Sequence, residues 1–301
     1  MTTTENLYPH LDEKAQKKLE LTDDARIRAI REGTWLALPH VKEALTKLED
    51  LRDYPKVTRM PCMLIIGPSF SGKTSIVEHF VNLHPPDLTP ENETTTTELV
   101  MIDAPPKPDL SDFYGRILDK LMAAFKPRAT AAEKYSQVKR LFRELGVKVL
   151  IVDEIHHLIA GSLNKQREFR NALKSLSNEA KVCIVAVGIE EAQTAFNADP
   201  QMASRFVPFE LPMWHLGKDL GILLKTLEKR TPLKKPSYLH STELMNAIHA
   251  RSESNLGDIF DLMKTAAVAA IRDGQECITE KLIKELDWVP PSKRKIFHRK
   301  R

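Results

Sequence analysis

The sequence has 301 residues, of which 42% are hydrophobic and 29% are charged, and its formal net charge is +4. This hydrophobic content excludes a largely disordered chain, and even the longest apolar runs, such as residues 182–187, are far shorter than the ~18 residues of a membrane span. Because residues 1–14 are polar and lack the apolar segment of a signal peptide, we expect a soluble, cytoplasmic protein.

The first predicted element is a helical segment. Residues 11–53 contain apolar side chains at three- and four-residue steps, such as Val41, Leu45 and Leu48, which predict helices with one apolar face. Prolines then interrupt the pattern. We therefore expect an N-terminal helical segment over residues 1–58.

Short apolar runs that alternate with helical patterns come next. The runs are too short for helices and lie at residues 62–66, 99–102, 147–152, 182–187 and 206–211. Helical patterns separate them, as at residues 110–125 and 133–145, whereas the proline- and threonine-rich residues 84–98 are interpreted as a loop. Strands that alternate with helices predict an α/β fold, with a parallel five-stranded sheet covered by helices on both faces, over residues 59–213.

The strand pattern ends at Pro212. Helical patterns follow at residues 217–230, 241–250, 255–273 and 279–286 and predict a small all-α lid domain over residues 214–288. Residues 289–301 form a basic tail, whose cationic side chains are Lys293, Arg294, Lys295, Arg299, Lys300 and Arg301. Clustered cations bind nucleic-acid phosphates, so the tail is either a nucleic-acid contact or a solvated chain end, and the sequence leaves both open.

The most specific motif follows the first predicted strand. It matches the GxxxxGKS/T pattern of a phosphate-binding (Walker A) loop and lies between a strand and a helix, as that loop requires. The loop and the next helical residue are Gly67, Pro68, Ser69, Phe70, Ser71, Gly72, Lys73, Thr74 and Ser75. The glycines let backbone N–H groups point at a polyphosphate, Lys73 is expected to reach the β- and γ-phosphates, and Thr74 to bind Mg²⁺. The expected cofactors are therefore ATP and Mg²⁺.

A second motif completes the nucleotide site. The apolar residues 149–152 predict a buried strand that delivers Asp153 and Glu154 to its carboxyl end, where such sheets bind ligands. Asp153 is expected to hold Mg²⁺, directly or through water, and Glu154 to activate the attacking water. GTP is disfavoured, because residues 164–167 begin like the guanine-reading NKxD signature but lack its aspartate.

Arg205 lies just before the fifth predicted strand. An arginine at this point in the motif order suits a finger that reaches the γ-phosphate of a neighbouring subunit. The alternative is an ordinary surface salt bridge. We interpret Arg205 as a catalytic finger because it follows the phosphate loop and the acidic strand in the expected order.

Together, these motifs and the helical lid resemble an AAA+ ATPase. Residues 35–40 (WLALPH) and 59–69 (RMPCMLIIGPS), which run into the phosphate loop, resemble more narrowly the TniB and TnsC family of AAA+ regulators of bacterial DNA transposition. The resemblance covers roughly residues 20–285. It places Lys73, Thr74, Asp153, Glu154 and Arg205 at the family's ATPase positions.

The resemblance implies ATP-dependent homo-oligomers, as rings or helical filaments, around double-stranded DNA. Such assemblies recruit a DDE transposase and help a target-selection protein choose the insertion site. The DNA contacts it implies are Lys107, Lys165, Arg167 and Arg170, from loops that would face the central channel, with Lys126 and Arg128, after the next helix, as further candidates. The alternative for each is a solvated surface charge. Contacts to phosphate make the binding largely independent of DNA sequence and sensitive to salt.

Two departures from the AAA+ pattern predict slow hydrolysis. The fourth strand ends in residues 187–189 (VGI), with Ile189 where a polar sensor residue is common. The lid segment at residues 254–258 (SNLGD) lacks the arginine often found there. Two alternative functions stay open: an AAA+ loader or initiator for a replicative helicase, and a signalling ATPase switch that binds only protein.

Histidines and cysteines offer little sign of a metal centre in the sequence. His156 and His157 follow the acidic pair, but consecutive side chains point apart, so we expect polar loop or DNA-channel residues and no shared metal ion. Cys62, Cys183 and Cys277 lack CxxC spacing, so we expect reduced thiols and neither disulfides nor zinc ligands.

Overall fold

The computed structural model describes residues 7–33, 35–87, 95–159 and 162–294. The chain forms two compact units, one made of Pro39–Pro212 and the other of Met1–Leu38 together with Met213–Arg301. The first unit contains a β-sheet and the second is helical.

The sheet of the first unit is parallel, with strand order β2-β3-β4-β1-β5. Its strands are β1 (Cys62–Ile66), β2 (Leu99–Asp103), β3 (Val149–Asp153), β4 (Cys183–Gly188) and β5 (Phe206–Glu210). β1, β3 and β4 are buried at every residue, because the sheet is covered on both faces and these strands lie inside it. The predicted α/β fold with a parallel five-stranded sheet is thus confirmed.

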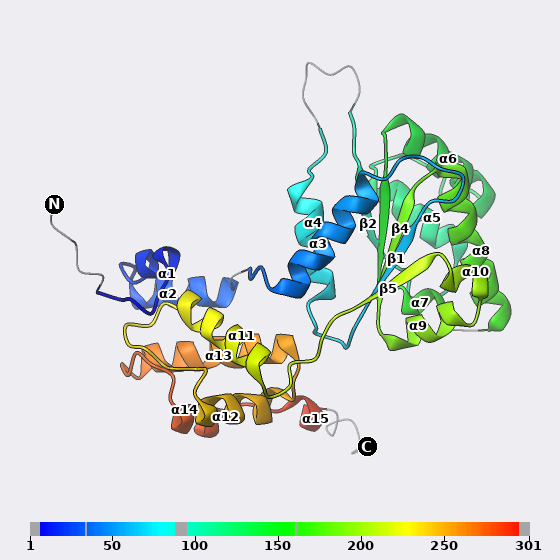
Figure 1. Ribbon diagram of the computed structural model, residues 1–301. Coiled ribbons are helices and arrows are strands. Elements are labelled where there is room, and N and C mark those ends of the chain that lie inside the picture. The colour runs from blue at the N-terminus through cyan, green and yellow to red at the C-terminus, as the bar shows by residue number, and fades with distance from the viewer. Residues whose placement is uncertain (1–6, 34, 88–94, 160–161, 295–301) are drawn as a thin grey trace. The chain divides into compact units, whose positions relative to one another are not determined.

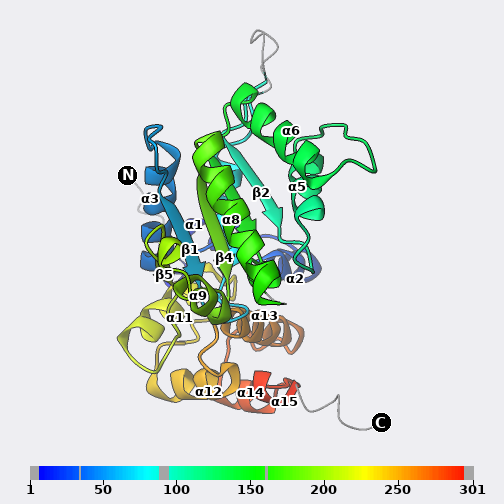
Figure 2. The same cartoon turned by 90° about the vertical axis from the view of Figure 1, so that its right-hand side faces the viewer.

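Helices cover both faces of the sheet. The helices of this unit are α3 (Pro39–Arg52), α4 (Lys73–Leu83), α5 (Leu110–Lys120), α6 (Ala131–Glu144), α7 (His156–Ile159), α8 (Leu163–Ala180), α9 (Glu190–Asn197) and α10 (Pro200–Ala203). Within the unit, α3 and α4 lie on one side of the sheet and α5, α6 and α8 on the other (Figure 1). One core joins α5, α6, α8 and α9 to the strands, with Phe113, Phe142 and Phe169 almost fully buried. Figure 2 shows α8 running along the sheet from this side.

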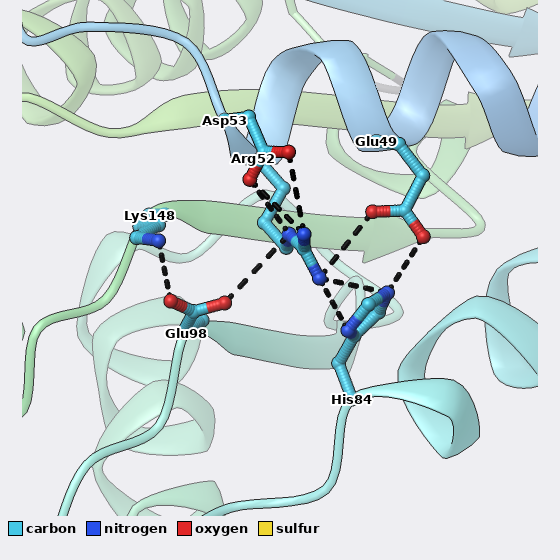
Figure 3. Close-up of polar contacts among 6 residues, drawn as sticks. All are labelled: Glu49, Arg52, Asp53, His84, Glu98 and Lys148. Carbon is cyan, nitrogen blue, oxygen red and sulfur yellow. Dashed lines mark hydrogen bonds and ion pairs between the residues drawn. The ribbon is translucent and has the colours of Figure 1, made fainter.

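A polar network helps to hold α3 on the sheet unit (Figure 3). Its members, from α3, the end of α4 and the segments before β2 and β3, are Glu49, Arg52, Asp53, His84, Glu98 and Lys148. Glu49 accepts from His84 at 2.7 Å, and Arg52 lies 3.7 Å from the Glu98 carboxylate. Together with the apolar packing of Ala44 and Leu48, which are fully buried, these contacts explain why α3 is part of this unit.

The second unit brings the two ends of the described chain together. Its helices are α1 (Glu13–Lys18), α2 (Asp23–Glu32), α11 (Lys218–Arg230), α12 (Thr242–Ser252), α13 (Leu256–Arg272), α14 (Glu280–Glu285) and α15 (Pro291–Arg294). Arg26 of α2 is fully buried and donates to both carboxylate oxygens of Glu276, at 2.6 and 2.8 Å. α2 also packs against α13, and its apolar residues Ile27 and Ile30 are buried.

This division differs from the expected one. The segment predicted over residues 1–58 is split between the units, because α1 and α2 pack on the C-terminal helices whereas α3 packs on α4. Within the basic tail, Arg294 pairs with the buried Asp258 at 2.7 Å and lies over the ring of Trp288. The tail residues Lys295, Arg299, Lys300 and Arg301 lie outside the described residues.

Two further expectations concern the whole chain. None of the helices in the described ranges is long and apolar enough to cross a membrane. Cys62 and Cys183 are buried free thiols and Cys277 is a half-buried one. Burial raises the pKa of Cys183 to about 12, which makes this thiol a poor nucleophile.

Candidate nucleotide-binding site

The predicted phosphate loop connects β1 to α4. Gly72 caps α4 with a left-handed φ of 90°, a conformation that favours glycine. A Cβ on Gly67 would lie 3.0 Å from Ser71 Oγ and 3.2 Å from Leu211 Cβ, so the loop packs tightly at its start. Phe70 is also left-handed, with a φ of 67°, and its side chain is exposed. The loop therefore wraps closely around the start of α4, as a phosphate cradle requires.

Lys73 occupies the first turn of α4, where the loop closes over it. Its side chain is buried, and Nζ donates to the carbonyl oxygens of Gly67 at 2.9 Å and Pro68 at 2.7 Å. Burial lowers the pKa of Lys73, while the charges of Glu154 and Asp153 act against that shift. The ammonium group is thus held inside the loop, next to the carboxylates that the sequence assigned to the same site.

Thr74 and Asp153 meet at the carboxyl end of β3. Thr74 Oγ1 donates to Asp153 Oδ2 at 2.6 Å, and the Glu154 backbone N–H donates to Asp153 Oδ1 at 2.7 Å. Burial raises the pKa of Asp153 despite these hydrogen bonds, and the negative charges of Glu154 and Asp103 add to the rise. A hydroxyl and a carboxylate are hard oxygen donors, and a buried carboxylate among like charges gains from a cation, so these residues fit Mg²⁺.

The sequence motifs do not predict a role for Asp103. It ends β2 and pairs in register with Asp153 on β3, so both carboxylates lie at the same edge of the sheet. The available signal was its position: an acidic residue that ends the apolar run at residues 99–102. Asp103 adds negative charge where a cation is expected.

Glu154 follows in a left-handed conformation, with a φ of 53°. Its carboxylate lies 3.2 Å from His156 Nε2, and its side chain is 47% exposed. Burial lowers the pKa of His156, although the charge of Glu154 opposes that shift. The rings of His156 and His157 lie only 4.5 Å apart. The expectation that these two side chains point apart is therefore wrong: the two rings lie together, next to the Glu154 carboxylate.

Arg205 lies at the opposite edge of the sheet from the phosphate loop. Its carbonyl accepts from Cys62 N–H at 3.2 Å, at the start of β1, whereas the loop follows the end of β1. Five residues of strand separate the two edges by roughly 16 Å. Asn178 Oδ1 accepts from the Arg205 guanidinium at 2.8 Å. Arg59 lies at the same edge and donates to Ser204. Arg205 is thus too distant from the phosphate loop of its own chain to contact a bound nucleotide.

The predicted DNA contacts divide into exposed and buried side chains. The exposed ones are Lys107, Lys126, Arg128, Lys165 and Arg167. Lys165 pairs with Glu168 at 3.0 Å in an exposed contact. Arg170 differs from the prediction: it is buried, lies 3.7 Å from Asp199 and contacts the carbonyl of Ala195. Its guanidinium packs α8 against the α9–α10 segment and is not presented to DNA.

Of the two segments that depart from the AAA+ pattern, the one in the helical unit has a structural role. Ile189 precedes α9 and forms no side-chain cap. Arg251, just before the lid segment, donates to the carbonyls of Leu286 and Trp288, both at 2.9 Å. Asp258 in the lid segment is paired with Arg294. Arg251 and Asp258 thus serve packing within the helical unit.

Comparison with known proteins identifies the family and the fold. A family model described as "Bacterial TniB protein" matches residues 26–216. Comparison with curated proteins gave no match. A crystal structure of Cdc6p from Pyrobaculum aerophilum is similar, with a TM-score of 0.58 and 19% identity over 83% of this chain and 67% of that one. The structure of the Aeropyrum pernix ORC2 protein, as ADPNP–ADP complexes, is also similar, with a TM-score of 0.59 and 16% identity. The match covers 89% of this chain and 74% of that one. At such identities the likeness shows the fold, which is that of AAA+ ATPases.

Proposed function

This chain belongs to the TniB family and is an AAA+ ATPase, and from that premise we propose that it regulates DNA transposition. In this proposal it oligomerises on duplex target DNA, recruits the transposase and couples target-site selection to slow ATP hydrolysis. The proposal that the chain binds and hydrolyses ATP rests on one observation. Thr74 donates a 2.6 Å hydrogen bond to Asp153, beside Lys73 and Glu154 at one edge of the sheet.

Each residue of this constellation has a distinct role. Lys73 exchanges its loop carbonyls for phosphate oxygens, which are charged and therefore stronger acceptors. Thr74 and Asp153 would hold Mg²⁺, which supplies neutralising charge to the phosphates when bound. Glu154, whose carboxylate is partly exposed, accepts a proton from the attacking water.

Arg205 completes the site of a neighbouring subunit. Its distance from its own phosphate loop supports a role between subunits, and Asn178 holds the guanidinium at the sheet edge. An arginine finger stabilises the charge that develops in the transition state, so hydrolysis depends on assembly. The absence of a polar side chain at Ile189 supports slow turnover.

DNA contacts are proposed for exposed lysines and arginines of the sheet unit. These are Lys107, Lys126, Arg128, Lys165 and Arg167. Lysine and arginine contacts to phosphate fix the register of a protein on DNA without reading its sequence. Such contacts to phosphate suit a protein that coats duplex DNA. The proposed protein partners, a DDE transposase and a target-selection protein, rest on the family alone.

Electron microscopy with duplex DNA in ADP, ATP or a non-hydrolysable ATP analogue tests this function. We expect rings or filaments only with the triphosphates. The Glu154→Gln variant should give stable assemblies with ATP, and Glu190→Gln, an exposed carboxyl at the start of α9, serves as the matched control.

Three outcomes would contradict the proposal. Monomers of Glu154→Gln in ATP and DNA would refute assembly. DNA affinity that does not change with salt would favour a switch that binds only protein. Capture of a replicative helicase in place of a transposase would favour a helicase loader.

A further inference from the structure

A group of three metal-ligating side chains lies beside the nucleotide site. Glu154, His156 and His157 each offer one ligand atom, and these atoms all lie within 4.8 Å of one another. Glu154 Oε2 and His156 Nε2 are 3.2 Å apart, and the two imidazole rings are tilted by 56° with centroids 4.5 Å apart. Nothing in the nucleotide chemistry requires a pair of histidines at this point.

The backbone beneath the three side chains is anchored to the sheet. Between them lies Ile155, which is fully buried and whose N–H donates to the carbonyl of Val187 on β4 at 2.9 Å. Ile155 also packs so closely on Gly188 that a Cβ there would lie 2.8 Å from Ile155 Cγ2. The carbonyl of Glu154 accepts from His157 N–H at 3.0 Å. The backbone that bears Glu154, His156 and His157 is therefore held in place, and only these side chains need to change rotamer to bind an ion.

The donor set matches a transition-metal site. Two imidazoles and one carboxylate form the protein ligand set of one class of zinc enzymes, in which water takes the fourth position. Tetrahedral ligands at ~2.1 Å from zinc lie about 3.4 Å apart, close to the distance found between Glu154 and His156. The Glu154 side chain is 47% exposed and that of His156 21% exposed, so an ion can enter from solvent.

We propose that Glu154, His156 and His157 bind Zn²⁺ or a similar divalent transition metal ion, and that this ion withdraws Glu154 from catalysis. The carboxylate that is expected to accept a proton from water would instead be a metal ligand. Metal binding itself is independent of the proposed function, whereas its effect on hydrolysis rests on that function.

This site differs from the proposed Mg²⁺ position in its donors. Thr74 and Asp153 offer only oxygen, which suits Mg²⁺, whereas imidazole nitrogen favours zinc, copper, nickel and cobalt. The charges of Glu191 and Lys73 also act on His156, one attracting and one repelling a cation. The two sites can thus be separated by metal type.

Titration of the full-length, nucleotide-free protein with Co²⁺ tests the proposal without any activity measurement. We expect one equivalent of Co²⁺ to give the visible absorption bands of a tetrahedral nitrogen and oxygen site, and Zn²⁺ to displace it. His157→Ala and Glu154→Gln should each weaken the affinity at least about tenfold, since loss of even an outer partner costs that much. His240→Ala, a half-exposed histidine of the helical unit, is the matched control and should bind as the wild type.

A second measurement compares ATP hydrolysis with and without Zn²⁺ at saturating Mg²⁺. We expect inhibition in the wild type and in His240→Ala, and at least about tenfold weaker sensitivity in His157→Ala. Equal Co²⁺ affinity in all variants, or no stoichiometric binding, would overturn the metal site whether or not the protein hydrolyses ATP. Binding without inhibition would overturn the withdrawal of Glu154 and leave the metal site standing.

Discussion

Removal of the buried guanidinium of Arg26 should destabilise the helical unit strongly. The Arg26→Met variant keeps most of the side-chain volume but leaves the Glu276 carboxylate, 9% exposed, without its bidentate partner. Lys234 remains, with its ammonium 3.5 Å from Glu276 and its backbone N–H bonded to the same carboxylate. Breaking a buried ion pair by removing one partner costs about 3–5 kcal/mol. Because the Lys234 contacts with Glu276 remain, we expect Arg26→Met to lower the free energy of unfolding by about 3 kcal/mol.

The free energy of unfolding can be followed by urea denaturation and calorimetry. A loss of about 3 kcal/mol corresponds to a fall in Tm of roughly 12 °C for a unit of this size. Asp23→Asn is the matched control, because Asp23 contacts the same guanidinium but is 65% exposed and should contribute at most about 1 kcal/mol. The double variant Arg26→Met with Glu276→Leu should recover part of the lost stability, since it leaves no buried charge, although the Lys234 backbone N–H loses its acceptor. An Arg26→Met variant as stable as Asp23→Asn would refute the reasoning.

The same pair predicts a dependence on pH. Burial acts to raise the pKa of Glu276, but the hydrogen bonds and charges of Arg26 and Lys234 outweigh it and lower the pKa overall. A carboxyl whose pKa is lower in the folded state contributes stability above its unfolded pKa of about 4.3, and this stability is lost as the pH falls through the folded pKa. The difference between wild type and Arg26→Met should therefore shrink below about pH 4.

Three further predictions concern the nucleotide and DNA sites. Lys73→Ala should abolish binding of fluorescent ATP, whereas Glu154→Gln should keep binding and lose hydrolysis at least about 100-fold in a phosphate-release assay. Arg205→Ala should slow hydrolysis about 1,000-fold with unchanged ATP affinity, and mixing it with Lys73→Ala subunits should restore activity, because each supplies what the other lacks. Replacing Lys107 and Lys165 by glutamine should weaken duplex binding and lower the slope of log affinity against log salt by about 2.

The sheet and the phosphate loop were predictable because their signals are local. A run of apolar residues such as 62–66 predicts β1 with the same bounds that the structure gives. Parallel strands end at one edge, so Asp153, at the end of the third strand, was expected at the same edge as Thr74; the strand order, with only β4 between β3 and β1, then allows their hydrogen bond. Local pattern and sheet topology together account for the nucleotide site.

Other features of the fold and the site were not predictable because they depend on contacts between residues that no local sequence pattern indicates. Arg26 and Glu276 are 250 residues apart in the sequence, so nothing near residue 26 indicates that α2 packs with the C-terminal helices. Arg170 follows Arg167 on one helix, but only Arg170 turns inward to Asp199. The left-handed backbone of Glu154 brings its carboxylate to His156, and a bulky residue rarely adopts that conformation.

Arg205 and the phosphate loop lie at opposite edges of the sheet, and this arrangement predicts that assembly controls the rate of ATP hydrolysis. Arg205 lies where β1 begins and the phosphate loop where β1 ends, so in the proposed assembly the two intersubunit contacts of one subunit would use different surfaces. Such heterologous contacts generate rings or open filaments. Hydrolysis per subunit should then rise with protein concentration across the assembly range, as measured by phosphate release alongside light scattering. A rate per subunit that stays constant while assemblies form would show that Arg205 contributes nothing to the neighbouring site.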